Sequence, residues 1–389
     1  VVIAITDAGI TRDHEDLRGN IAPNYGEIGL DSDGADKATN GMDDDNNGRV
    51  DDAYGINLVL GDGIDPGETV NGEHGTQVTG FAAAVTDNDL GIAGTANQCR
   101  FFPMKAAPRG RASIIAGYDG LLYAASRGMK VASLSWGSPV FSAIEEEIMR
   151  TVINDFDVAV VASGGNENGH VVYYPAGYRD VIGVAGVNAA SAVNTTWGEH
   201  IDLVSTGGTT TSGLNEYFDL PAASSYAAPS ISGVVALARS AHPEVSARAI
   251  AHHVRQTGRS ITLFNLGKEE FIGRGRPDAR EVVANEPTMS PGIVIDSLIL
   301  DLPEGHDGEF LALGDSGSIR VALSNLLGPA TNVTISIENY TDDSLSMRLG
   351  STSMNVGDLP KTTSSRVLEP IPITIVPGDL SKERLETIT

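Results

Sequence analysis

Cysteine is nearly absent from this sequence. The 389 residues include a single cysteine, Cys99, so the chain cannot form a disulfide within itself. We expect Cys99 to be a small buried apolar residue. Long apolar runs are also missing: no stretch approaches the ~18 apolar residues that a membrane-spanning helix needs, so we expect no membrane span. A hydrophobic content of 41% still suffices for a large core.

Basic residues are also few compared with acidic residues. Lys and Arg number 26 against 51 Asp and Glu, which gives a formal net charge of −25. Phosphate backbones are bound by clustered Lys and Arg, so this balance argues against a nucleic-acid partner. The acidic excess is compatible with bound cations and with a need for solubility in salty surroundings.

The first part of the chain alternates between short apolar runs and helical patterns. The apolar runs predict strands buried on both faces of a sheet, at residues 1–6, 131–135, 158–163 and 180–186. Helical patterns cover residues 74–85, 113–128, 142–156 and 222–240. Ser142, followed three residues later by Glu145, predicts a capping box. The alternation predicts an α/β domain over residues 1–285, with a mostly parallel sheet and helices on both faces.

The pattern changes after residue 285. Residues 286–292 predict a linker, and residues 293–389 predict a β-sandwich of immunoglobulin-like size, because alternating runs such as 319–323 and 332–337 are separated by turn residues. The final LETIT resembles the beginning of another strand, so we expect the domain to continue beyond the end of this chain.

Three reactive side chains stand in apolar or glycine-rich settings. Asp7 ends the first strand in ITDAG, His74 begins a helix in GEHGTQVTG, and Ser225 begins a helix in AASSYAAPS. Taken singly, each residue is more often a cap or a turn residue. Together they fit one chemistry: a serine hydroxyl needs an imidazole to accept its proton, and the imidazole needs a carboxylate to orient it.

These motifs resemble those of the subtilase family of serine proteases. HGTQVTG is similar to the family's histidine motif, SSYAAP to its serine motif G-T-S-x-A-x-P, and ITDAGI to its aspartate motif. The resemblance covers residues 1–285 and implies a subtilisin-like fold with Ser225 as nucleophile, His74 as base and Asp7 as the residue that orients it. It also implies a secreted serine endopeptidase, in the extracellular space or cell envelope, with protein or peptide substrates. Since family members usually carry chain ahead of the first core strand, and many a propeptide that assists folding, we expect residues 1–389 alone to refold poorly.

The resemblance implies further roles around these three residues. Asn166, in GGNENG, matches the side chain that stabilises the oxyanion, with the Ser225 backbone N–H as its partner. The walls of the substrate pocket match Ser135, Trp136, Gly137, Ser163, Gly164 and Gly165, and Tyr173 stands where it could restrict entry. Ala8 replaces a hydroxyl residue beside Asp7. Ala223 replaces a glycine, at a cost of roughly 1 kcal/mol if that position requires a positive φ.

An acidic stretch, NGMDDDNNGRVDD at residues 40–52, predicts a calcium loop. Its spacing follows the front of an EF-hand loop, with ligands from Asp43, Asp45, Asn47, the backbone of Arg49, and Asp51. Tyr54 stands where the final Glu would be, so Asp51 or Asp52 would supply the missing oxygens. A solvated acidic loop is the simpler alternative, but five Asp within ten residues would repel one another without a counter-cation.

Two more Ca²⁺ sites rest on the family resemblance alone. Asp16 matches a calcium ligand of many subtilases, and its partner would be Asp87 or Asn88. Asp202, together with backbone oxygens of residues 176–181, is similar to a weaker second site.

The second domain offers no cluster of His, Cys or carboxylates. It resembles the CARDB-like sandwich modules of bacterial secreted enzymes, which implies a spacer or adhesive role toward a cell-surface or extracellular partner.

The sequence leaves two hypotheses for the function of the protein. The first is the secreted endopeptidase, in which Glu167 near the pocket would favour a basic residue before the scissile bond. The alternative is a catalytically weak or inactive, calcium-bound structural module. An α/β-hydrolase is disfavoured because G-x-S-x-G and the order Ser, Asp, His are absent.

Overall fold

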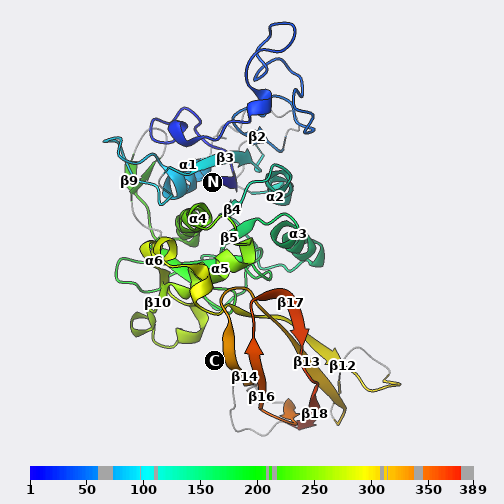
Figure 1. The fold of residues 1–389 in the computed structure, drawn as a ribbon. Coiled ribbons are helices and arrows are strands. Elements are labelled where there is room, and N and C mark those ends of the chain that lie inside the picture. Colours follow the sequence, from blue (N-terminus) through cyan, green and yellow to red (C-terminus); the bar gives the residue numbers. More distant parts are fainter. Residues whose placement is uncertain are drawn as a thin grey trace. The chain divides into compact units, whose positions relative to one another are not determined.

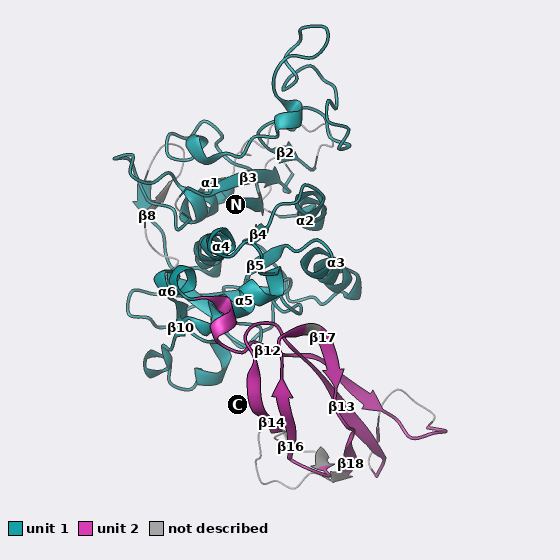
Figure 2. Ribbon diagram, in the orientation of Figure 1, with its two compact units in different colours: residues 1–285 teal, residues 286–389 magenta. Residues whose placement is uncertain are grey.

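The computed structural model describes residues 1–59, 73–96, 98–108, 113–206, 210–212, 217–306, 311–312, 314–336 and 345–377. The chain forms two compact units, residues 1–285 and 286–389 (Figure 2). Within the described ranges, no helix combines the length and the apolar character that crossing a membrane requires.

A seven-stranded sheet in which every neighbouring pair is parallel forms the centre of the first unit. Its strand order is β2-β3-β1-β4-β5-β6-β7. The strands are β1 (Val2–Asp7), β2 (Ile56–Asn57), β3 (Arg100–Lys105), β4 (Val131–Leu134), β5 (Ala159–Ser163), β6 (Ile182–Val187) and β7 (Leu203–Thr206). The four predicted strand regions are β1, β4, β5 and β6, and they form a continuous block of the sheet because both of their faces are apolar.

Helices cover both faces of this sheet: α2 and α3 lie on one side, and α1 and α4 lie on the other (Figure 1). Among the described residues of this unit, the helices are α1 (Glu73–Ala83), α2 (Gly117–Ser126), α3 (Ala143–Asn154), α4 (Ser224–Ala241), α5 (Ala247–Gln256) and α6 (Ala279–Ala284). Helix α4 packs against α1 and against strands β4 to β7, and most of its residues are buried. This central position explains its small, apolar sequence.

The predicted capping box at the start of α3 forms only in part. The Ser142 hydroxyl accepts the Glu145 N–H at 3.4 Å, as expected. The Glu145 carboxylate does not return to the Ser142 N–H, which donates to the Tyr178 hydroxyl instead. Glu145 Oε2 accepts hydrogen bonds from Tyr118 at 2.8 Å and Tyr178 at 2.9 Å, because tertiary partners outcompete the local one.

Short elements complete the first unit. Two short antiparallel pairs are β8 (Thr210–Ser212) with β9 (Tyr217–Asp219), and β10 (Gly258–Arg259) with β11 (Arg276–Pro277). The 3-10 turns are η1 (Arg18–Asn20), η2 (Tyr25–Glu27), η3 (Thr262–Phe264) and η4 (Glu269–Phe271). Cys99 is buried in the main apolar core, as expected for a free cysteine.

The second unit is built from antiparallel strands. One sheet has the order β12-β13-β18-β15, with β17 also paired to β13, and a second sheet pairs β14 with β16. The strands are β12 (Ile293–Asp301), β13 (Ser316–Asn325), β14 (Ala330–Ser336), β15 (Leu345–Leu349), β16 (Ser353–Leu359), β17 (Thr362–Val367) and β18 (Ile371–Pro377). Apolar side chains from both sheets share one core, including Leu323, Ile335 and Leu359. This is a β-rich second unit of the expected kind; its expected last strand lies outside the described residues.

Residues 286–292 are more than a linker. They contain η5 (Pro287–Met289) and belong to the second unit. The Gly292 N–H donates to the Asn325 side chain at 2.9 Å, and the Gly328 N–H donates to the Ser290 carbonyl at 2.8 Å. These bonds anchor the segment to the end of β13 and to the turn that follows it.

Candidate active site

The carboxyl ends of three adjacent strands bring polar residues to one edge of the sheet. Asp7 ends β1, Ser135 directly follows β4, and Ser163 ends β5. In open parallel sheets, ligands bind outside this edge. A cavity of about 650 Å³ lies here, and it is lined by these three residues together with His74, Asn166 and Ser225, among others. The sequence motifs therefore converge on one cavity.

Asp7 and His74 form a direct pair. His74 Nδ1 lies 2.8 Å from Asp7 Oδ1, and that oxygen also accepts the Ala8 N–H at 2.7 Å. Close packing makes this possible: a Cβ at Gly75 would lie 1.9 Å from the Gly9 carbonyl oxygen, so only glycine lets α1 approach the loop after β1. Burial alone would lower the pKa of His74, but the charge of Asp7 and the hydrogen bond to it outweigh burial and raise the pKa above 6.5.

Ser225 lies in the first turn of α4. Its hydroxyl donates to the Ser135 carbonyl at a long 3.4 Å, and its own carbonyl accepts the Ser135 hydroxyl at 2.8 Å. Hydrogen bonds of a reactive serine are often long before a ligand arrives. Ala223, the N-cap, has φ −147° and ψ 150°. This extended conformation suits any residue. Position 223 therefore does not require a positive φ, and alanine causes no backbone strain there.

Asn166 is oriented by its contact with Ser224. The Ser224 backbone N–H and hydroxyl donate to Asn166 Oδ1 at 2.8 Å and 3.0 Å. Since a backbone N–H can only donate, the amide atom that faces it must be the oxygen. The donor Nδ2 of Asn166 is thereby the amide atom left for a ligand in the cavity.

The predicted pocket walls largely line the same cavity. Ser135, Trp136, Gly137, Ser163, Gly165 and Tyr173 contribute to it. Gly164 does not line the cavity: it is buried, and its N–H donates to the Val184 carbonyl at 2.9 Å. Gly137 and Gly165 leave little room for a side chain, because a Cβ would lie 2.7 Å from the Tyr174 carbonyl oxygen and 2.8 Å from the Tyr173 ring, respectively.

Tyr173 and Glu167 form a pair at this cavity. The Tyr173 hydroxyl donates to Glu167 Oε1, and the Thr196 hydroxyl donates to Glu167 Oε2 at 2.9 Å. Burial would raise the pKa of Glu167, but these bonds outweigh it and lower the pKa below its ordinary range. The hydrogen bond to Glu167, followed by burial, raises the pKa of Tyr173 to about 12. Glu167 therefore presents a negative charge to the cavity.

Asp16, the predicted calcium ligand, lies in the interior of the first unit. It is fully buried, and its two oxygens accept the Asn88 side-chain amide at 2.7 Å and the Ile92 N–H at 3.0 Å. Asp87, the alternative partner, is exposed. Of the two expected partners, Asn88 is the one that contacts Asp16.

The second site expected from the resemblance is filled by a side chain. Arg255 Nη2 donates to Asp202 Oδ2 at 2.9 Å and to the Val181 carbonyl at 3.1 Å. These are the carboxylate and one of the backbone oxygens expected to hold a cation. The expectation of a metal at Asp202 is corrected, because a guanidinium already supplies the positive charge.

The acidic loop is arranged differently from the EF-hand order. Asp43 accepts the Asn47 and Gly48 N–H groups at 3.1 Å and 2.8 Å, and Asp51 accepts the Gly41 N–H at 3.1 Å. These carboxylates therefore accept hydrogen bonds from the backbone of their own loop. The Arg49 N–H donates to Asn47 Oδ1 at 2.8 Å, so that side-chain oxygen is engaged within the loop as well.

A different acidic group converges beside the loop. Among the described residues, ligand atoms of Glu27, Asp45 and Asp52 lie within 4.8 Å of one another. Burial, opposed by N–H donors from Asp44 and Asp45 and supported by the charges of Asp52 and Asp45, raises the pKa of Glu27. The sequence predicted Asp45 as a ligand of the loop and Asp52 as an alternative source of the missing oxygens. Glu27 was missed, because YGE in η2 carries no spacing that connects it to the loop.

Comparison with known proteins identifies the family. A family model described as the subtilase family matches residues 1–275, and the chain belongs to this family. It is 31% identical over 292 residues to the halolysin-like extracellular serine protease Nep of Natrialba magadii, a match that covers 74% of this chain and 48% of Nep. It is 32% identical over 225 residues to subtilisin BL of Lederbergia lenta, covering 54% of this chain and 80% of that protein.

A solved protease structure supports the same fold. The structure, from Pseudoalteromonas arctica, matches with a TM-score of 0.56 at 25% identity and covers 73% of this chain and 89% of its own. The chain spans about half the length of Nep. The first unit thus has the subtilisin-like α/β fold, and the resemblance seen in its motifs is confirmed.

Proposed function

We propose that this protein is a subtilisin-like serine endopeptidase that hydrolyses peptide bonds through an acyl-enzyme on Ser225. One observation carries the proposal: the Asp7–His74 pair, joined at 2.8 Å, lines the same cavity as Ser225 and Asn166. Membership of the subtilase family and relatives named as serine proteases support it.

The chemistry follows from the arrangement of these groups. Asp7 holds Nδ1 of His74, which leaves Nε2 to accept the Ser225 proton as Oγ attacks the scissile carbonyl carbon. The Asn166 amide and the Ser225 backbone N–H, which has no intrahelical partner in the first turn of α4, stabilise the oxyanion. His74 then gives its proton to the leaving amine, and water hydrolyses the acyl-enzyme.

The charge of the cavity bears on the substrate. The carboxylates of Glu145 and Glu167 line it, and no Lys or Arg is among its described lining residues. We therefore expect preference for a basic residue before the scissile bond. Cleavage of a peptide library by wild type and Glu167→Gln tests this, since an unchanged preference in the variant would contradict a role for Glu167.

The setting of the enzyme is also part of the proposal. We infer that it acts outside the cytoplasm, because Nep is named as an extracellular protease, and that it binds Ca²⁺ at Asp16 and at the acidic loop. The second unit would serve as a spacer or adhesive module toward an extracellular partner.

Labelling with a fluorophosphonate probe tests the proposed activity. The probe should label wild type and Ser230→Ala but not Ser225→Ala. Ser230 lies on the same helix, donates to the Tyr226 carbonyl at 3.2 Å and does not line the cavity. Calcium-loaded, folded wild type that remains unlabelled would refute the proposal and favour the alternative, an inactive structural module.

A further inference from the structure

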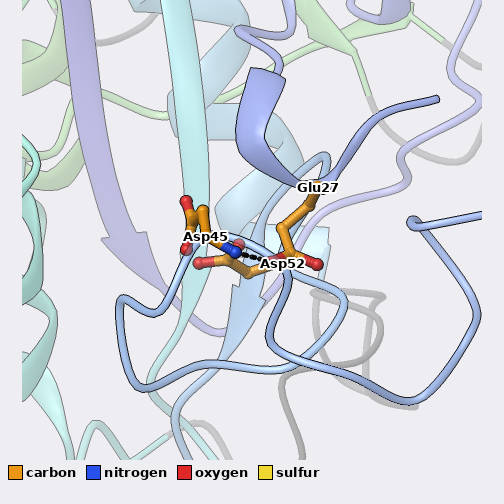
Figure 3. A group of neighbouring side chains, drawn as sticks. All are labelled: Glu27, Asp45 and Asp52. Atoms are coloured by element: carbon orange, nitrogen blue, oxygen red, sulfur yellow. Dashed lines mark hydrogen bonds between the residues drawn. The ribbon is translucent and has the colours of Figure 1, made fainter. Parts of the chain in front are cut away.

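We propose that Glu27, Asp45 and Asp52 form a binding site for a divalent cation of the calcium type, distinct in its ligands from the EF-hand order of the loop. Figure 3 shows the three side chains gathered in one place; Glu27 comes from η2, and Asp45 and Asp52 come from two places in the acidic loop. The inference does not depend on the proposed peptidase activity.

The geometry suits one shared ion. Ligand atoms of the three carboxylates lie within 4.8 Å of one another. Two oxygens bound to one Ca²⁺ at 2.3–2.6 Å lie at most about 5 Å apart. Glu27 and Asp52 are fully buried, and the Asp45 side chain is 14% exposed. The group is therefore an interior cluster rather than a set of surface charges.

Glu27 supplies the observation that points to a ligand. Its Oε1 accepts the N–H groups of Asp44 and Asp45 at 2.7 Å and 3.2 Å. Its Oε2 is buried and has no hydrogen-bond partner among the described residues. A buried carboxylate oxygen without a partner is costly. A cation at the centre of the cluster would give Oε2 the partner it lacks.

The neighbouring groups orient two of the carboxylates but do not neutralise the cluster. Arg127 donates to Asp45 at 2.9 Å, Tyr123 donates to Asp52, and Asn24 donates to both. Of these donors only Arg127 carries a charge. Three carboxylates with one guanidinium leave two negative charges, which a divalent cation would balance.

The donor atoms indicate the class of cation. The three converging side chains offer only carboxylate oxygens, which suit Ca²⁺ or Mg²⁺ rather than a metal that prefers sulfur or imidazole. Three side chains fill less than a full coordination shell, so water would complete it.

The site would join three segments of the chain. Glu27 comes from η2, Asp45 and Asp52 from the acidic loop, and Tyr123 and Arg127 from the carboxyl end of α2. Tyr118, near the other end of α2, lines the cavity. Cation binding would therefore stabilise the corner of the fold that supports one wall of the cavity.

Calorimetric titration of the full chain with Ca²⁺ after chelation tests the proposal. Ser225→Ala serves as the parent, so that self-digestion cannot interfere and the result stays valid if the protein is not a peptidase. Glu27→Gln in this parent should bind one Ca²⁺ fewer, or bind it at least tenfold more weakly. Asp43→Asn, on the same loop, should match the parent. Unchanged uptake in Glu27→Gln, or loss only in Asp43→Asn, would overturn the site.

A second measurement does not depend on the folding of Glu27→Gln. Tb³⁺ replaces Ca²⁺ at oxygen sites and emits when a nearby tyrosine is excited, and the Tyr123 hydroxyl contacts Asp52. Tyr123→Phe keeps all three carboxylates. It should lower the sensitised emission at least twofold. Emission equal to that of the parent would overturn the site.

Discussion

Replacing Ser224 by Ala tests whether Asn166 must be held in one orientation. The substitution removes the 3.0 Å hydroxyl bond to Asn166 Oδ1 and keeps the 2.8 Å backbone bond. One neutral hydrogen bond contributes about 1 kcal/mol, so kcat should fall about fivefold. KM should stay unchanged, because the oxyanion exists only in the transition state. Asn166→Ala should lower kcat by about 10²–10³, the usual effect of losing one oxyanion donor.

A double-mutant cycle on a chromogenic peptide separates this positioning role from a general structural one. If Ser224 acts through Asn166, adding Ser224→Ala to Asn166→Ala should change kcat less than twofold. The reasoning is refuted if Ser224→Ala costs fivefold in both backgrounds, or if it raises KM and leaves kcat unchanged. A kcat unaffected by Asn166→Ala would refute the oxyanion role itself.

Three further predictions follow from other contacts. The rate constant kcat/KM should rise with pH through the pKa of His74, above 6.5, because Asp7 favours the protonated imidazole that cannot accept a proton. Gly75→Ala should cost about 1–3 kcal/mol of stability by overpacking and lower kcat at least ~10²-fold by displacing His74, since its Cβ would meet the Gly9 carbonyl at 1.9 Å. Burial and nearby positive groups lower the pKa of His252 from 6.5 to about 4, so the free energy of unfolding should fall by about 3 kcal/mol as the pH drops through that window.

Each of these predictions has its own control. A pH–rate profile whose acid limb lies below 6.5 would contradict the first. Gly169→Ala is the matched control for the second, because its nearest neighbour would be 3.9 Å away; equal effects of the two substitutions would argue against the packing explanation. For the third, denaturant unfolding at several pH values should show a smaller acid loss in His252→Gln than in wild type, and equal losses would contradict it.

The sequence predicted the residues whose positions depend on local structure. Asp7 ends a strand and His74 begins a helix, so the rule that parallel strands share one carboxyl edge brings both to the same place. Strand β3 was missed because RFFPMK contains Arg100, Pro103 and Lys105, which interrupt an apolar run. These residues nevertheless form a strand, because β3 pairs with β1 on one side and with β2 on the other, and this pairing outweighs the local sequence pattern.

Contacts between segments far apart in the chain could not be predicted. The Asp43 spacing predicted a calcium loop, but it could not show that Glu27 lies against that loop or that Tyr123 contacts Asp52. In the same way, the sequence around Asp202 gave no sign that Arg255 from α5 would reach it. Long side chains that arrive from other elements carry no periodic signal.

The guanidinium at Asp202 has a consequence for how the two ends of the sheet respond to solution conditions. A metal ion can be diluted or chelated away, whereas Arg255 is tethered to α5 and remains at a fixed, high effective concentration beside β7. The β7 end is therefore insensitive to the free cation concentration. At the opposite end, β2 follows the acidic loop, where the proposed cation would bind beside Arg127, so cation depletion should loosen the sheet from that side first.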